Sequence, residues 1–177
     1  MRILLLVTFS LLLNGCTVMD RKVDVVTPFT LSPYLGKWYE IARLDHSFEQ
    51  GLTKVTAEYS LSPEDPGLIR VINRGYRQED DRWQQAHGRA HFWDSDQVGR
   101  FKVAFFRPFY GAYQIHDIIS YQGRYIAALV IGPDIDYVWI LSRTPELSDA
   151  VAKRFLAKLE QLGVDTSALI WLSPPPQ

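Results

Sequence analysis

The chain contains a single sulfur nucleophile, the thiol of Cys16, and this cysteine lies just after a hydrophobic segment near the N-terminus. The segment runs from Ile3 to Leu13 and follows the basic residue Arg2. It has about the length of the hydrophobic part of a secretory signal peptide and is shorter than the roughly 20 residues that a membrane-spanning helix requires. The sequence therefore predicts export, followed by removal of this segment.

Residues 13–16, Leu-Asn-Gly-Cys, resemble the lipoprotein box of bacterial lipoproteins. The resemblance implies that residues 1–15 are a lipoprotein signal peptide and that Cys16 receives diacylglycerol and becomes the first residue of the mature chain. Asn14 stands where Ala or Ser is more usual, so the alternative is an ordinary signal peptide that ends near a cysteine. Thr17, in place of Asp, implies sorting to the cell outer membrane on its periplasm-facing side, where several acyl chains make a stable lipid anchor.

The other residues that could serve as nucleophiles, bases or metal ligands form no catalytic pattern. On a strand, His87 and His91 would share one face but lie about 13 Å apart, too far to bind one metal ion. Ser142 lacks the G-x-S-x-G context of a hydrolase nucleophile. We therefore expect no enzymatic activity, no bound metal and no cofactor.

Acidic and basic residues are spread along the chain and nearly balance. Without Arg2, 18 Lys and Arg face 20 Asp and Glu, so the expected mature chain has a net charge of −2. This balance argues against nucleic acid or another polyanion as a partner. Because the only cysteine is used for lipid, packing rather than a disulfide must stabilise the fold.

After a polar N-terminal stretch, turn residues divide the chain into short strands. We expect residues 16–28 to be the lipidated N-terminus and tether, residues 29–172 the folded domain, and residues 173–177 a Pro-rich tail. Polar and apolar residues alternate along residues 54–61, which is typical of a strand that buries one face. Comparable stretches predict eight strands at residues 38–44, 54–61, 68–76, 83–93, 100–106, 112–119, 124–131 and 137–143. Their short connections favour antiparallel hairpins, and eight such strands can close into a barrel without exposed edges.

One amphipathic helix follows the predicted strands. Thr144, Pro145 and Glu146 provide start signals, and Gly163 provides a stop signal. The apolar residues between them recur every three to four positions, at Leu147, Val151, Phe155, Leu159 and Leu162. We expect this helix to pack against the outside of the barrel and residues 169–172 to add a final short strand.

Three segments of the predicted barrel resemble the signature regions of the lipocalin family. Residues 36–39, Gly-Lys-Trp-Tyr, match the G-x-W-Y motif that opens the first lipocalin strand. Residues 132–137 and 139–145 resemble the second and third signature regions, in the same order along the chain. The resemblance covers about residues 29–172. It implies an all-β fold, an eight-stranded antiparallel up-and-down barrel with one C-terminal α-helix packed outside and a short final strand.

Trp38 and Arg143 would lie on the first and last strands of such a barrel, which are adjacent once it closes. A guanidinium over an indole contributes roughly 0.5 to 2 kcal/mol. We interpret the pair as a structural closure of one barrel end rather than as ligand-binding residues. Arg143 is also expected to donate to backbone carbonyls near the N-terminal segment, because its five donors need partners when buried.

Small side chains on one predicted strand leave volume inside the barrel, which either large side chains of the opposite strands or a ligand must fill. Which face points inward is left open by the alternation, because an outer helix buries parts of both faces. A dry, fully packed interior is the alternative to a ligand pocket. The expected pocket residues are Val55, Ala57, Tyr59, Ala90, Phe92, Val103, Phe105, Tyr125 and Leu129.

An apolar cavity with few polar groups suits a fatty acid or lysophospholipid ligand, and the lipocalin resemblance implies the same class. Burying ten methylenes would contribute roughly 8 kcal/mol before association costs. The alternative is an envelope-stabilising or partner-binding lipoprotein with an incidental cavity. Residues 105–111 place four aromatic residues beside an arginine in a hairpin loop, which could meet a membrane or form a homodimer.

Overall fold

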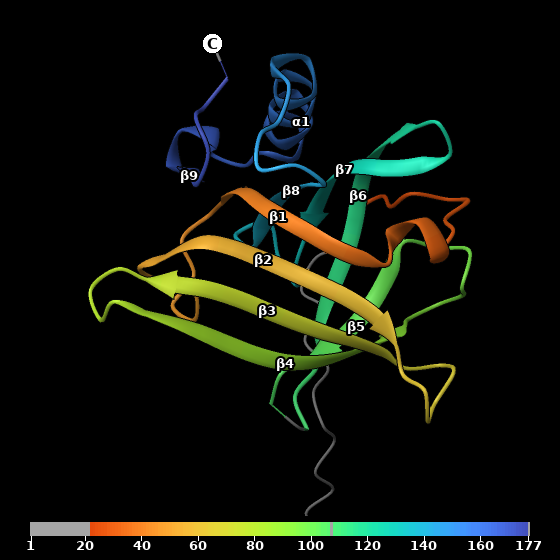
Figure 1. The fold of residues 1–177 in the computed structure, drawn as a ribbon. Helices are drawn as coiled ribbons and strands as arrows, with labels where there is room; N and C mark the ends of the chain where they lie inside the picture. The colour runs from red at the N-terminus through yellow and green to blue at the C-terminus, as the bar shows by residue number, and fades with distance from the viewer. Residues whose placement is uncertain (1–21, 107, 177) are drawn as a thin grey trace, which may run out of the picture.

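The computed structural model describes residues 22–106 and 108–176, which form a closed antiparallel barrel with one helix on its outside (Figure 1). The eight barrel strands are β1 (Gly36–Arg43), β2 (Leu52–Leu61), β3 (Ile69–Arg77), β4 (Arg82–Phe92), β5 (Arg100–Ala104), β6 (Gly111–Tyr121), β7 (Arg124–Ile131) and β8 (Val138–Ser142). Consecutive strands pair, and β1 pairs with both β2 and β8, which closes the barrel. The predicted all-β barrel is confirmed. The predicted signal peptide and residues 16–21 of the predicted tether, Cys16 included, lie outside the described residues.

Tight turns between neighbouring strands account for the antiparallel order. Between β6 and β7, Gln122 and Gly123 both have left-handed backbones, with φ of 49° and 73°. Two such residues in succession are typical of a two-residue hairpin turn whose twist matches that of the strands. The predicted extent of β5 was too long, since the strand ends at Ala104 and Phe106 is 79% exposed in the following loop.

The single α-helix of the described chain, α1 (Asp149–Leu162), starts later than the predicted start signals. Before it, the side chains of Ser142 and Thr144 both donate to the carbonyl of Glu146, at 3.3 and 2.7 Å, and hold this segment as a turn. Gly163 ends the helix with a left-handed φ of 83°, as predicted. No helix within residues 22–106 and 108–176 is long and apolar enough to span a membrane.

After a short 3-10 helix, η2 (Thr166–Ala168), the final strand β9 (Ile170–Trp171) pairs with β1 outside the barrel. The helix is fixed by apolar packing and by an ion pair, because Arg154 donates to both carboxylate oxygens of Asp117 on β6, at 2.7 and 2.8 Å. Figure 1 shows α1 and β9 together on one side of the barrel, next to β1 and β8.

Two separate hydrophobic clusters lie on the two faces of the barrel wall. One fills the interior and includes Trp38, Tyr59 and Phe101. The other lies between the wall and α1, and joins Phe155 and Leu159 to residues of β1, β7 and β8. Because β7 contributes to both clusters, its side chains are buried on either face.

Candidate binding cavity and barrel closure

Trp38 and Arg143 seal one end of the barrel, at which the 3-10 helix η1 (Ser32–Tyr34) crosses the opening. The guanidinium carbon of Arg143 lies 3.8 Å from the centroid of the Trp38 ring, so the predicted contact is present. The indole of Trp38 is fully buried and donates to the backbone carbonyl of Tyr34 at 2.8 Å. This bond connects the first barrel strand to the segment that covers the opening.

Arg143 uses its guanidinium group to bind four backbone carbonyls from different parts of the chain. The acceptors are Pro33 and Leu35 at 2.8 Å, Lys37 at 2.7 Å and Tyr125 at 3.2 Å. The predicted donation to the N-terminal segment is therefore confirmed. Because one planar group connects η1, β1 and β7, no shorter or non-planar cation could replace it without loss of several bonds.

Above this closure, the barrel interior contains a small apolar cavity of about 10 Å³. Its lining combines aliphatic, phenylalanine and tyrosine side chains, namely Leu31, Tyr34, Tyr59, Ile69, Ala90, Phe101, Val103 and Tyr113. A cavity of this volume has room for about one water molecule, so as it stands it does not hold an acyl chain. Several residues around it remain partly exposed, including Ala57, Val103 and Phe105, so the interior cluster is not sealed from solvent on every side.

Three tyrosine hydroxyl groups meet at this cavity. Tyr59 donates to the hydroxyl of Tyr113 at 2.8 Å, and the hydroxyls of Tyr113 and Tyr34 share a hydrogen bond of 2.6 Å. Burial raises the pKa of all three phenols above the ordinary value of 10, so they stay protonated at neutral pH. They give an apolar chamber a small set of neutral polar groups that can orient a ligand.

The structure brings most of the predicted pocket residues together in the interior cluster. These are Ala57, Tyr59, Ala90, Phe92, Val103, Phe105 and Tyr125. Gly88 allows the Phe105 ring to approach β4, because a Cβ at this position would lie 2.8 Å from that ring. The space left by the small side chains of β4 is therefore filled in part by the Phe105 ring.

Two predicted pocket residues lie elsewhere, and both errors arise at β-bulges. Leu129 is fully buried in the outer cluster with Phe155, because an extra residue, Ile126, is inserted between the β7 partners of Ile119 and Ser120. Val55 belongs to a similar irregularity in β2, and it lines an outer groove instead. A bulge reverses the alternation of faces beyond it, so residues four apart no longer share a face.

Sequence reasoning did not place Leu31, Tyr34, Ile69 and Tyr113 in the pocket. The alternation that puts Val103 inside the barrel also puts Phe101 there, two residues earlier on the same strand. Tyr34 precedes the first strand in a segment without periodicity. Its position depends on where η1 crosses the barrel end, for which the sequence carries no local signal.

At the other end of the interior lies a buried polar cluster around Arg43. Arg43 donates to the carboxylate of Glu40 at 2.6 Å and to the backbone carbonyls of Glu49 and Leu52 at 3.0 and 3.1 Å. The Glu49 carboxylate accepts from the indole of Trp139 at 2.9 Å. One guanidinium thus faces two buried carboxyl groups, which cannot both be neutralised by it.

Burial and the nearby charge of Glu49 raise the pKa of Glu40 to about 8, against the opposing effect of Arg43. Burial also raises the pKa of Glu49, while the hydrogen bond from Trp139 opposes the rise. The cluster therefore holds a proton at neutral pH. In the same region, burial lowers the pKa of His46, which stacks between Phe48 and Tyr137 with ring centroids 5.3 and 4.9 Å away.

The other candidate reactive groups contact residues that do not line the cavity. The ring of His87 interacts with Gln85, and the ring of His91 with the carbonyl of Gly67. The hydroxyl of Ser142 interacts with Thr144 in the turn before α1. Within the described part of the chain, no group of three or more His, Cys, Asp or Glu residues comes together to hold a metal ion.

A closed eight-stranded antiparallel barrel with a Trp–Arg closure at one end and a helix against its wall defines the lipocalin class of fold. The chain belongs to the lipocalin family, since residues 29–174 match the family model of the lipocalin-like domain. It is similar over nearly its full length to proteins named outer membrane lipoprotein Blc. The protein from Escherichia coli K12 is 47% identical over 99% of both chains, and that from Vibrio cholerae is 45% identical over 97% of this chain and 98% of the relative.

More distant similarities agree with this assignment. Rat apolipoprotein D is 36% identical over 67% of this chain and 63% of its own length. Among solved structures, the cockroach allergen Per a 4 has a TM-score of 0.65 and 18% identity, covering 88% of this chain and 95% of its own. The tryptamine complex of the amine-binding protein of Rhodnius prolixus has a TM-score of 0.61 and 18% identity, covering 86% of this chain and 85% of its own. At such identities the structures support the fold alone.

Proposed function

We propose that the protein binds fatty acids or lysophospholipids inside the barrel and stores or transports them. The observation that carries this proposal is the apolar interior cluster, which surrounds three neutral tyrosine hydroxyls and is partly open to solvent. Apolar walls bind an alkyl chain, and a few hydroxyl donors suit a carboxylate or an ester. The family and the names of the Blc relatives support a small-ligand binder rather than an enzyme.

Ligand entry requires side chains to move, because the cavity of about 10 Å³ is far smaller than an acyl chain. Val103, which lines the cavity, and Phe105, which packs on the interior cluster, are partly exposed and lie next to the loop that contains Phe106 and Phe109. We propose that rotation of these side chains opens the interior. The energetic cost of this opening reduces the affinity that chain burial would otherwise provide.

The soluble chain from residue 17 to 177 contains every strand and α1, and it permits a direct test. After purification under non-denaturing conditions, native mass spectrometry should show one bound acyl lipid per protein, which a fluorescent fatty acid displaces. Ala90→Phe places a large ring in the cavity and should reduce occupancy at least tenfold, at a stability cost of about 1 to 3 kcal/mol. Ala168→Phe, on the exposed surface of η2, is the matched control. An empty wild-type protein that does not bind the fluorescent fatty acid would overturn the proposal.

The small cavity volume favours one alternative, an envelope-stabilising or partner-binding lipoprotein whose cavity is incidental. Three aromatic side chains in the loops near the open end, Phe48, Phe106 and Phe109, are 58%, 79% and 72% exposed and could meet a membrane or a second subunit. Under this alternative, the soluble chain would be empty of lipid and would self-associate or bind a partner. Alanine substitution of Phe106 and Phe109 would then abolish association without changing ligand occupancy.

We also propose that Cys16 anchors the protein to the outer membrane, with the domain facing the periplasm. The lipoprotein box supports this, as do the names of the Blc relatives from Escherichia coli and Vibrio cholerae. Cys16→Ser should move the protein from the membrane fraction to the soluble fraction, because the acyl chains supply the affinity for the bilayer. Cell fractionation with immunoblotting measures this, and mass spectrometry should find lipid on residue 16 of the wild-type protein only. Membrane association that survives the substitution would contradict the anchor.

A further inference from the structure

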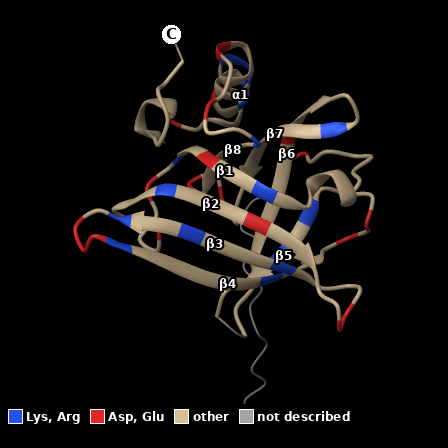
Figure 2. Ribbon diagram, viewed as in Figure 1, with Lys and Arg blue, Asp and Glu red and all other residues tan. Residues whose placement is uncertain are grey.

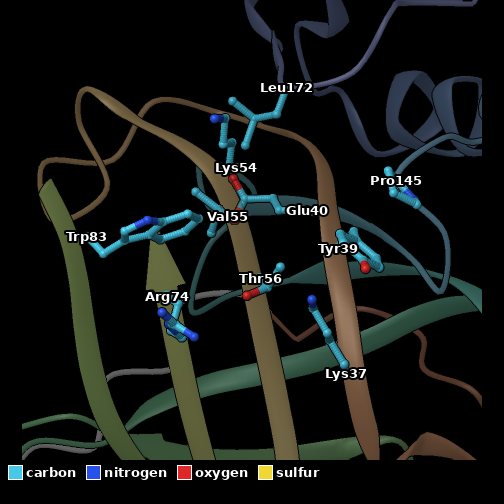
Figure 3. Close-up of a pocket in the computed structure, with 10 residues that line it drawn as sticks. All are labelled: Lys37, Tyr39, Glu40, Lys54, Val55, Thr56, Arg74, Trp83, Pro145 and Leu172. Carbon is cyan, nitrogen blue, oxygen red and sulfur yellow. The ribbon is translucent and has the colours of Figure 1, made fainter. Parts of the chain in front are cut away.

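Strand β1 changes its hydrogen-bonding partner part-way along its length. It pairs with β2 as far as Tyr39, opposite Thr56, and with β9 from Ala42, opposite Trp171. β9 therefore takes the place beside β1 that β2 has left. At this branch point, on the outer surface of the barrel, lies a groove of about 350 Å³ (Figure 3). Its volume is within the range of small-molecule sites, roughly 300 to 1,000 Å³.

Three exposed cationic side chains surround the groove, each from a different strand. Lys37 comes from β1, Lys54 from β2 and Arg74 from β3. Figure 2 shows blue Lys or Arg segments on each of these three strands. In the described part of the chain, none of the three takes part in an ion pair. Their charges are thus available to a ligand.

Each of these cations lies over an aromatic ring rather than extending freely into solvent. The distances to the ring centroids are 4.5 Å for Lys37 over Tyr39, 5.1 Å for Lys54 over Tyr76 and 5.3 Å for Arg74 over Trp83. Such contacts restrict long, flexible side chains, so these side chains lose less conformational entropy when a ligand binds. Figure 3 shows Arg74 beside Trp83, while Lys37 and Lys54 approach the groove from different sides.

Acidic groups near the groove compensate these charges only in part. Glu40 lines the groove but is bound to Arg43, and burial raises its pKa to about 8, so it is largely uncharged at neutral pH. Glu58 lies opposite Lys37 in the β1–β2 ladder without forming an ion pair with it. The positive charge of the groove therefore exceeds the negative charge at pH 7.

Apolar side chains complete the groove. Val55 from β2, Pro145 from the turn before α1 and Leu172 after β9 line it between the cations. We propose that this groove binds a single anionic amphiphile that carries a phosphate group. The phosphate lies among Lys37, Lys54 and Arg74, and the alkyl part lies against Val55 and Leu172. A concave site suits one molecule better than a bilayer surface, which contacts protruding residues. The site is separate from the barrel interior, and the proposal does not depend on a ligand there.

The experiment uses dodecyl phosphate below its micelle concentration as the probe for residues 17–177. Lys54→Gln/Arg74→Gln removes two groove charges, and Arg89→Gln/Lys153→Gln removes two exposed charges from β4 and α1 as a matched control. Calorimetric titration should show at least tenfold weaker binding to the groove variant and unchanged binding to the control. Added salt should weaken the wild-type affinity. Thermal melting checks that all variants are folded.

Two further measurements separate this site from the barrel interior and from membranes. Trp83 lines the groove, so a fluorescence change upon titration should disappear in Trp83→Phe, while Ala90→Phe should leave it intact. Equal affinity of both charge variants, or loss of binding in Ala90→Phe alone, would overturn the proposal. So would inorganic phosphate that binds as tightly as dodecyl phosphate, or binding to phosphatidylglycerol vesicles without binding of the monomer.

Discussion

Replacing Trp38 with alanine is expected to lower the free energy of unfolding by about 3 to 5 kcal/mol. The indole is fully buried, donates to the Tyr34 carbonyl and supports the Arg143 guanidinium, so its removal leaves a cavity and an unpaired acceptor at once. For a chain of this size the melting temperature should fall by roughly 10 °C. Urea denaturation monitored by circular dichroism measures the change.

The same variant separates a structural role from a ligand-binding role. Where it remains folded, Trp38→Ala should retain most of its affinity for a fluorescent fatty acid, since Trp38 is not among the residues that line the interior cavity. Trp83→Ala serves as a control, because Trp83 is 52% exposed and its loss should cost less than about 1 kcal/mol. An unchanged melting temperature combined with lost binding would show that Trp38 is a binding residue instead.

The sequence predicted the barrel because alternation, turn residues and hairpin lengths all point to the same topology. It predicted the contact between Trp38 and Arg143 because closure of an eight-stranded barrel must bring its first and last strands together. Neither conclusion required knowledge of side-chain packing. The helix start was misplaced because Thr144 and Glu146 bond each other in a turn, a use of the same residue types that capping rules do not distinguish.

The interior was less predictable, for two physical reasons. On β7 nearly every residue from Ala127 to Ile131 is fully buried, so polarity does not mark the inner face, and the bulge at Ile126 moves Leu129 outward. A bulge in β2 likewise places Val55 in the outer groove. Cavity volume depends on the rotamers of opposing rings such as Phe105 over Gly88, which no local pattern encodes.

The buried cluster around Arg43 is expected to make stability depend on pH. The Glu40 carboxyl binds its proton more tightly in the folded protein, where its pKa is about 8, than in the unfolded chain, where it is 4.5. The free energy of unfolding should therefore fall as pH rises between these values. His46 has a lowered pKa and acts in the opposite sense, mostly below its ordinary value of 6.5. The fall in stability toward pH 8 therefore reports mainly on the carboxyl groups.

Arg43→Met should destabilise the protein by about 3 to 5 kcal/mol at pH 8, because two buried carboxyl groups lose their counter-charge. At pH 6.5 the loss should be smaller by about 1 to 2 kcal/mol, since both groups can then hold protons at lower cost. Urea denaturation at the two pH values measures the difference.

Adding Glu40→Gln to Arg43→Met should recover part of the stability at pH 8 and reduce the pH dependence, because one of the two uncompensated carboxyl groups is then removed. A loss that is equal at both pH values, and unaffected by Glu40→Gln, would mean that Arg43 acts through packing and its bonds to the carbonyls of Glu49 and Leu52. The double variant therefore distinguishes the charge of Arg43 from its shape. Glu40 also lines the outer groove. Protonation of the Glu40 carboxyl therefore affects both the stability of the barrel and the net charge of this groove.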